Sequence, residues 1–303
     1  MTPVAPRIDA EVPAFLTDLG IPGIVDVHVH FMPSSVMHAV WRFFDRAEDE
    51  YGTAWPIAYR GSDEDRLAIL RSLGVRRFTS LVYAHKPGMA AWLNDWSLDF
   101  AGRTPDCVPT ATFFPEPGVE AYVDSALRRG ARLFKVHLQV GGFDPRDAAL
   151  DGVWAVLAER GVPVVLHCGS GPLAGPFTGP GPTGEVLRRH PGLRLVIAHL
   201  GGPEYADFLT LAEGSQRCGL DTTMAATDFL DQWGEYPASL VPRLEALALD
   251  GRVWFGSDFP NIPYPYAHQV EALVRLGLGE DGLRSVLWHN GVALVGSPEV
   301  RAG

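Results

Sequence analysis

Short apolar runs alternate along the chain with longer amphipathic stretches, and this alternation limits the folds that the chain can adopt. Eight of these runs are predicted strands: Ile24–His30, Arg77–Ala84, Val108–Phe114, Arg132–Leu138, Val162–Cys168, Leu193–Leu200, Gly219–Met224 and Arg252–Asp258. Several are almost entirely apolar, which is typical of parallel strands covered on both faces. Helical patterns fall between them, at Asp63–Leu73, Met89–Gly102, Val119–Arg129, Ala148–Arg160 and Ala238–Leu249. The repeated strand–helix order therefore predicts an α/β fold built from βαβ crossovers.

The number of repeats favours closure of the sheet into a (β/α)₈ TIM barrel, with an open doubly wound sheet as the alternative. A length of 303 residues suits one such barrel, for which about 250 residues is typical. We expect a single domain over residues 1–303, in which residues 1–23 form a short N-terminal extension. Two segments are predicted to lack regular structure: the aromatic-rich residues 31–62, and Gly169–Gly184, interpreted as a long loop after the fifth strand.

The composition of the chain indicates which kinds of molecule it can bind and in which compartment it is expected. The net charge of −11 argues against binding to nucleic acid, because phosphates would be repelled. No apolar run approaches the roughly 20 residues that span a bilayer, and the start MTPVAPRIDAEVPAF lacks the regions of a signal peptide. The three cysteines form no CxxC pair, which indicates a reducing compartment. We therefore expect a cytoplasmic protein with a small-molecule substrate, and a homo-oligomer is compatible with the sequence.

A local motif with two histidines ends the first predicted strand. In Asp26-Val-His28-Val-His30, side chains alternate between the two faces of a strand, so His28 and His30 point the same way. Barrel enzymes place their chemistry at the C-terminal ends of the strands. Two imidazoles on one face at that end can both reach a single cation.

Other predicted strands end in the same manner. His167 ends the fifth apolar run, His199 the sixth and Asp258 the eighth. A buried imidazolium or carboxylate is costly unless it is paired or bound to a metal. Several such groups at the same ends of parallel strands therefore predict a metal site with an open position, as catalytic sites have.

Four ordered motifs resemble those of the amidohydrolase superfamily. They are Asp26-Val-His28-Val-His30-Phe-Met-Pro33, His167-Cys-Gly, His190-Pro-Gly-Leu-Arg-Leu-Val-Ile-Ala-His199-Leu-Gly-Gly202 and Phe255-Gly-Ser-Asp258-Phe-Pro260. They look closest to the amidohydrolase-related branch that includes aminocarboxymuconate-semialdehyde decarboxylase-like enzymes. The similarity extends from about residue 24 to about residue 296 of this chain.

The resemblance implies a (β/α)₈ fold that binds one or two divalent metals, most often zinc, with manganese as the alternative. His28, His30 and His167 would be metal ligands. Asp258 would be a ligand or the acid/base beside the metal-bound water. His199 matches a histidine that serves as an acid/base in mononuclear members and holds the second metal in binuclear ones.

Lys135 and His137 lie two positions apart at the end of the fourth predicted strand, so both are expected to face the barrel lumen, where substrate binding is the favoured role. In binuclear amidohydrolases a carboxylated lysine of this strand bridges two metals, whereas the decarboxylase-like members lack it. One ion is therefore expected, or two if Lys135 is carboxylated. Lys135 could instead anchor a substrate carboxylate or be structural, and His137 could bind substrate, orient a ligand or be structural.

The leading hypothesis for the function is a metal-dependent hydrolase. A metal-bound water would attack the amide, lactone or ester carbonyl of a small, carboxylate-bearing substrate. The alternative is a non-oxidative decarboxylase of an unsaturated or aromatic carboxylic acid, acting with the same groups. A non-catalytic barrel that binds metal is a third and more remote hypothesis.

Overall fold

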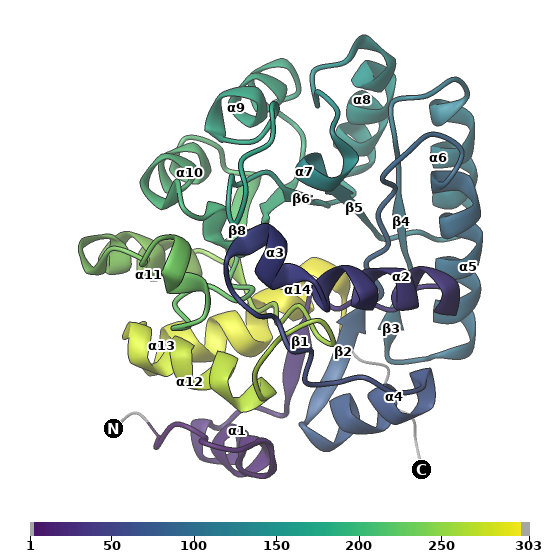
Figure 1. Ribbon diagram of the computed structural model, residues 1–303. Coiled ribbons are helices and arrows are strands. Elements are labelled where there is room, and N and C mark those ends of the chain that lie inside the picture. Colours follow the sequence, from purple (N-terminus) through teal and green to yellow (C-terminus); the bar gives the residue numbers. More distant parts are fainter. Residues whose placement is uncertain (1–2, 298–303) are drawn as a thin grey trace. The chain divides into compact units, whose positions relative to one another are not determined.

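The computed structural model describes residues 3–297 and divides them into two compact units (Figure 1). The first unit combines the two ends of the sequence, residues 3–79 and 222–297. The second unit is the intervening segment Ser80–Asp221. Each unit is α/β, and each contains parallel strands followed by helices.

The first unit is built around two parallel strands. β1 (Ile24–Asp26) pairs with β2 (Val75–Thr79), and β9 (Val253–Trp254) lies in the same unit. All three residues of β1 are buried, which agrees with the apolar side chains of Ile24 and Val25. The helices of this unit are η1 (Asp9–Glu11), α1 (Val12–Leu19), α2 (Ser34–Phe44), α3 (Ala47–Tyr51), α4 (Asp63–Ser72), η4 (Leu230–Trp233), η5 (Ala238–Leu240), α11 (Val241–Leu249), α12 (Tyr266–Leu276), α13 (Gly279–Arg284), the π-helical turn η6 (Ser285–His289) and α14 (Asn290–Val295).

The second unit holds a sheet of parallel strands in chain order. The strands of this sheet are β4 (Thr110–Thr112), β5 (Leu133–His137), β6 (Val164–His167), β7 (Leu195–Ile197) and β8 (Cys218–Asp221). The short strand β3 (Cys107–Val108) precedes them in the same unit and is not part of this sheet. β4 to β8 pair successively, and the β5–β6 register sets His137 opposite His167. The helices are α5 (Ala90–Arg103), α6 (Val119–Arg128), α7 (Leu138–Gly141), η2 (Ala148–Leu150), α8 (Asp151–Arg160), α9 (Pro180–Arg189), η3 (Ala198–Gly201) and α10 (Tyr205–Glu213). Figure 1 shows α8, α9 and α10 on one side of these strands.

The predicted strands are present but shorter than expected. β1 ends at Asp26 rather than His30, β7 at Ile197 rather than Leu200, and β9 at Trp254 rather than Asp258. The φ angles of His199 (57°) and Asp258 (69°) are positive, which a strand excludes. The apolar pattern continues past the point where the backbone leaves the ladder, so the predicted strand ends were wrong.

One predicted strand is divided in two. The run Val108–Phe114 corresponds to β3 and β4, which Pro109 separates. Proline has no N–H to donate to a neighbouring strand, so an interruption at this residue is expected.

Two segments predicted to be irregular contain helices. Residues 31–62 form α2 and α3, and α2 buries Met37 and Trp41, which lie one helical turn apart. The predicted loop Gly169–Gly184 ends early because α9 begins at Pro180, where the missing N–H of proline costs the helix nothing. The five helices predicted from periodicity are all present, with ends shifted by a few residues.

No helix in the described part of the chain is long and apolar enough to cross a membrane.

The buried side chain of Asn290 joins the start of α14 to the elements before it. Its Nδ2 donates to the carbonyl oxygens of Ala248 and Val253, both at 2.8 Å. We predict that Asn290→Ala lowers the free energy of unfolding by about 1–3 kcal/mol, because two buried carbonyls lose their donor. Urea unfolding measures this loss. The matched change Gln216→Ala, at an exposed amide, is expected to alter stability by less than about 0.5 kcal/mol. Equal effects of the two changes would contradict the role of Asn290.

Candidate active site

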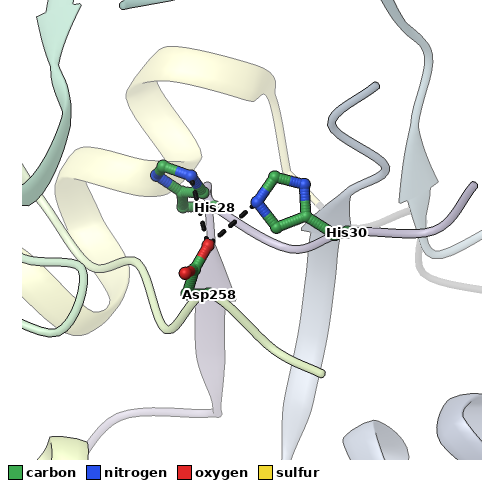
Figure 2. A group of neighbouring side chains, drawn as sticks. All are labelled: His28, His30 and Asp258. Carbon is green, nitrogen blue, oxygen red and sulfur yellow. Dashed lines mark hydrogen bonds and ion pairs between the residues drawn. The ribbon is translucent and has the colours of Figure 1, made fainter. Parts of the chain in front are cut away.

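Two imidazoles and a carboxylate converge in the first unit (Figure 2). Asp258 Oδ1 lies 2.9 Å from His30 Nε2 and 3.5 Å from His28 Nε2. Donor atoms of the three residues all lie within 4.8 Å of one another. Both histidines are buried, whereas the Asp258 side chain is 14% exposed. The structure thus brings together three residues that the sequence singled out from opposite ends of the chain.

The backbone explains why these side chains meet. The segment after β1 runs alongside the segment after β9: Val27 N donates to Phe255 O at 2.9 Å, and His30 N donates to Phe259 O at 2.7 Å. Between these bonds, Asp258 N donates to the carbonyl of His28 at 2.9 Å. The two histidines therefore lie beyond the end of β1. Their positions relative to Asp258 are fixed by these three backbone hydrogen bonds between the segments that follow β1 and β9.

A buried carboxylate, that of Asp26, is hydrogen-bonded to both segments that carry this group. Asp26 accepts hydrogen bonds from Ser257 Oγ at 2.6 Å, Tyr266 Oη at 2.8 Å, His28 N at 3.1 Å and Ser257 N at 3.2 Å. Burial raises the pKa of Asp26 to about 7, although each of these hydrogen bonds lowers it. One carboxylate thereby holds the backbone on both sides of the site. Sequence reasoning missed Ser257 and Tyr266, and only the adjacency of Ser257 to Asp258 hinted at either.

The donor set fits a divalent metal. Zinc binds imidazole nitrogen and carboxylate oxygen at roughly 2.0–2.2 Å, so two ligands of one tetrahedral ion lie roughly 3–4 Å apart. The distances from Asp258 Oδ1 to the two imidazoles, 2.9 and 3.5 Å, are close to that spacing. His28, His30 and Asp258 could therefore hold such an ion after small movements of their side chains.

The remaining predicted site residues lie in the second unit. Lys135 is fully buried in β5, His137 and His167 are the last residues of β5 and β6, and His199 follows β7 in η3. The ring centroids of His137 and His167 are 3.8 Å apart, and those of His167 and His199 are 4.6 Å apart. The structure therefore brings His137, His167 and His199 into one row.

A second buried carboxylate, which sequence reasoning missed, fixes the backbone of His199. Asp221 is fully buried at the end of β8, and its Oδ1 accepts from His199 N at 3.0 Å. This bond holds His199 in its positive-φ conformation. Asp221 could have been found from the sequence, because it is an aspartate at the end of a mainly apolar strand. The same pattern singled out Asp258.

Comparison with known proteins decides the family. A family model described as Amidohydrolase matches residues 25–296, which is most of the chain. The chain belongs to this amidohydrolase family. Among curated protein sequences, none matches the chain significantly.

Solved structures with this fold include enzymes of two kinds. An uncharacterised TIM-barrel protein from Bordetella bronchiseptica is 18% identical with a TM-score of 0.70, covering 90% of this chain and 98% of that one. A putative 2-pyrone-4,6-dicarboxylic acid hydrolase from Pseudomonas putida is 17% identical with a TM-score of 0.59, covering 91% and 98%. The 5-carboxyvanillate decarboxylase from Novosphingobium aromaticivorans, in a structure with bound manganese, is 13% identical with a TM-score of 0.60, covering 91% and 98%.

These similarities confirm the predicted α/β fold of the (β/α)₈ barrel type and the resemblance to the amidohydrolase superfamily. The family is metal-dependent, and the structures with the same fold include a decarboxylase and a putative hydrolase. Family membership thus supports an enzyme that uses a metal.

Gly256 provides a steric test of the metal group. A Cβ atom at this position would lie 2.0 Å from Thr223 Oγ1 and 2.7 Å from His28 Cβ. We predict that Gly256→Ala displaces His28 and weakens the affinity for zinc by about 10-fold or more. Competition with a chelator measures this affinity. The control Gly102→Ala adds a methyl group where no atom lies within 4 Å, and it is expected to bind zinc like the parent. Unchanged affinity in Gly256→Ala would show that His28 is not a ligand.

Proposed function

We propose that the protein is a metal-dependent hydrolase that acts on the amide, lactone or ester carbonyl of a small, carboxylate-bearing molecule. The observation that carries this proposal is the buried group of His28, His30 and Asp258, whose donor atoms lie within 4.8 Å of one another. Family membership supports it, because the family is metal-dependent.

In this proposal His28, His30 and Asp258 hold one divalent ion, zinc or manganese, and His167 is a further ligand. When bound, such an ion polarises a carbonyl oxygen and lowers the pKa of water. The assignment of His167 rests on the sequence pattern and the family. Two ions are the alternative, which requires carboxylation of Lys135.

Proton transfer is assigned to Asp258. Its Oδ1 is directed at the two imidazoles, so we assign Oδ2 to accept the proton of the attacking water and pass it to the leaving group. His199 is proposed as a second acid/base. The side chain of Lys135, which is buried in β5, is proposed to contact the substrate carboxylate, because a lysine amine can bind a carboxylate as a point charge.

The second candidate is a non-oxidative decarboxylase. A manganese-containing decarboxylase of aromatic carboxylic acids has the same fold and a similar extent. In that reaction Asp258 or His199 would protonate the substrate carbon that bears the carboxylate before carbon dioxide leaves. The two candidates thus differ in the atom that receives the proton.

Product analysis separates the two reactions. The purified, metal-loaded protein is incubated with 2-pyrone-4,6-dicarboxylic acid or with 5-carboxyvanillate, the compounds named for two of the structural relatives. The proposal predicts a ring-opened acid from the lactone, without release of carbon dioxide. Carbon dioxide released from the aromatic acid, with no ring opening of the lactone, would assign the decarboxylase instead.

We predict that Asp258→Asn retains the fold and most of the bound metal but lowers turnover by about 100-fold or more, because the amide cannot accept the proton. Circular dichroism, elemental analysis and steady-state kinetics measure the three quantities. The control Asp281→Asn removes the charge of an aspartate whose side chain is 84% exposed, and its turnover is expected to match the parent. A near-normal rate in Asp258→Asn would remove this residue from the mechanism.

A further inference from the structure

Three histidine rings form a row across the ends of consecutive strands in the second unit. His137 and His167 have their ring centroids 3.8 Å apart with an angle of 12° between the planes, so the rings are stacked. His199 meets His167 edge to face, at 4.6 Å and 61°. His167 therefore lies between two other imidazoles, with the face of one and the edge of the other against it.

The strand register produces the stack. In the parallel pairing of β5 with β6, His137 lies opposite His167. Neighbouring strands are about 4.8 Å apart, and opposite residues direct their side chains to the same face. Two flat rings that leave adjacent strands at this spacing pack face to face, and the contact persists as long as both strands keep their register.

His137 is fixed independently of His167. Its Nδ1 accepts a hydrogen bond from Val140 N at 3.3 Å, in the first turn of α7. An acceptor nitrogen carries no proton, so the neutral ring holds its proton on Nε2. The Tyr83 ring lies 5.3 Å from the same imidazole. His137 is thus held by its own strand, by α7 and by a neighbouring aromatic ring.

We propose that His137 is a positioning residue that sets the plane of the His167 ring by stacking, rather than a group that binds substrate. This inference rests on the proposed function, in which His167 is a metal ligand. A ligand imidazole must direct its nitrogen lone pair at the ion, so a surface that fixes the plane of the ring raises the affinity for metal. One face of His137 is covered by His167 and its Nδ1 is engaged by Val140, so both contacts favour a supporting role.

Two substitutions separate the ring from its nitrogen atoms. His137→Phe keeps a flat ring against His167 but has no nitrogen, whereas His137→Asn keeps a short polar acceptor but has no ring. The proposal predicts that His137→Asn weakens the binding of Zn²⁺ and Mn²⁺ by about 10-fold, and that His137→Phe stays close to the parent. Affinity is measured by competition with a chelator, using the metal ions alone. Loss in both variants, or in neither, would overturn the proposal.

A control at His167 keeps the two proposals distinguishable. His167→Ala should lose affinity at least as far as His137→Asn. If His167→Ala binds metal like the parent, the ligand set of the proposed function is wrong and the role of His137 falls with it. If His167→Ala loses metal while His137→Asn does not, only the positioning role is wrong.

A spectroscopic measurement on the unmodified protein does not depend on how the variants fold. Correlation of ring nitrogens with ring protons by NMR reports the tautomer of each histidine. The proposal requires the Nε2–H tautomer for His137, because Nδ1 accepts from Val140 N. Detection of the Nδ1–H tautomer would show that the ring is not held in this way.

Discussion

The carboxylate of Asp26 is the constraint on which the rest of the first unit depends. It has no exposed surface and accepts four hydrogen bonds, two from Ser257 and one each from Tyr266 and the backbone of His28. A buried carboxylate without such partners would cost several kcal/mol. Satisfying it requires the start and the end of the sequence to meet, because Ser257 and Tyr266 lie 231 and 240 positions further along the chain. The approach of Asp258 to the two histidines follows from this meeting.

The second unit also has a buried aspartate at the end of a strand that binds the backbone of a histidine. Asp26 is the last residue of β1 and Asp221 the last residue of β8, and both are fully buried. Each accepts a hydrogen bond from the backbone N–H of a histidine beyond a strand end: His28 at 3.1 Å and His199 at 3.0 Å. The two histidines, whose chemical roles are proposed above, are thus carried by backbone that has left the strand but is still hydrogen-bonded to the carboxylate of a strand's last residue. Supporting hydrogen bonds of this kind help to hold the residues of a site in a fixed geometry.

The sequence predicted the strands and the main helices, and it singled out His28, His30 and Asp258, which the structure groups, but it did not predict the bonds that join these parts. Apolar runs and helical periodicity are local properties, so β6 and α6 could be recognised from their own residues. The ends of β7 and β9 could not be recognised in this way, because the hydrophobicity of a segment does not indicate the positive φ of His199 or Asp258. The hydrogen-bond partners of Asp26 could not be predicted from the sequence for another reason. A serine and a tyrosine over two hundred positions away carry no mark of the residue that they will contact.

Hydrolysis and decarboxylation can share one set of metal ligands, so those ligands alone do not determine the reaction. What differs is the atom that receives a proton, a leaving heteroatom in one case and a carbon atom in the other. That choice depends on how the substrate is oriented, and therefore on groups outside the ligand set. In the proposed function the buried side chain of Lys135 orients the substrate. If Lys135 binds a carboxylate that is kept, the carbonyl is presented for attack by water. A carboxylate that is to be lost must instead lie away from such an ion pair, because the pair would stabilise negative charge on the carboxylate, and that charge has to pass to the rest of the substrate when neutral carbon dioxide leaves.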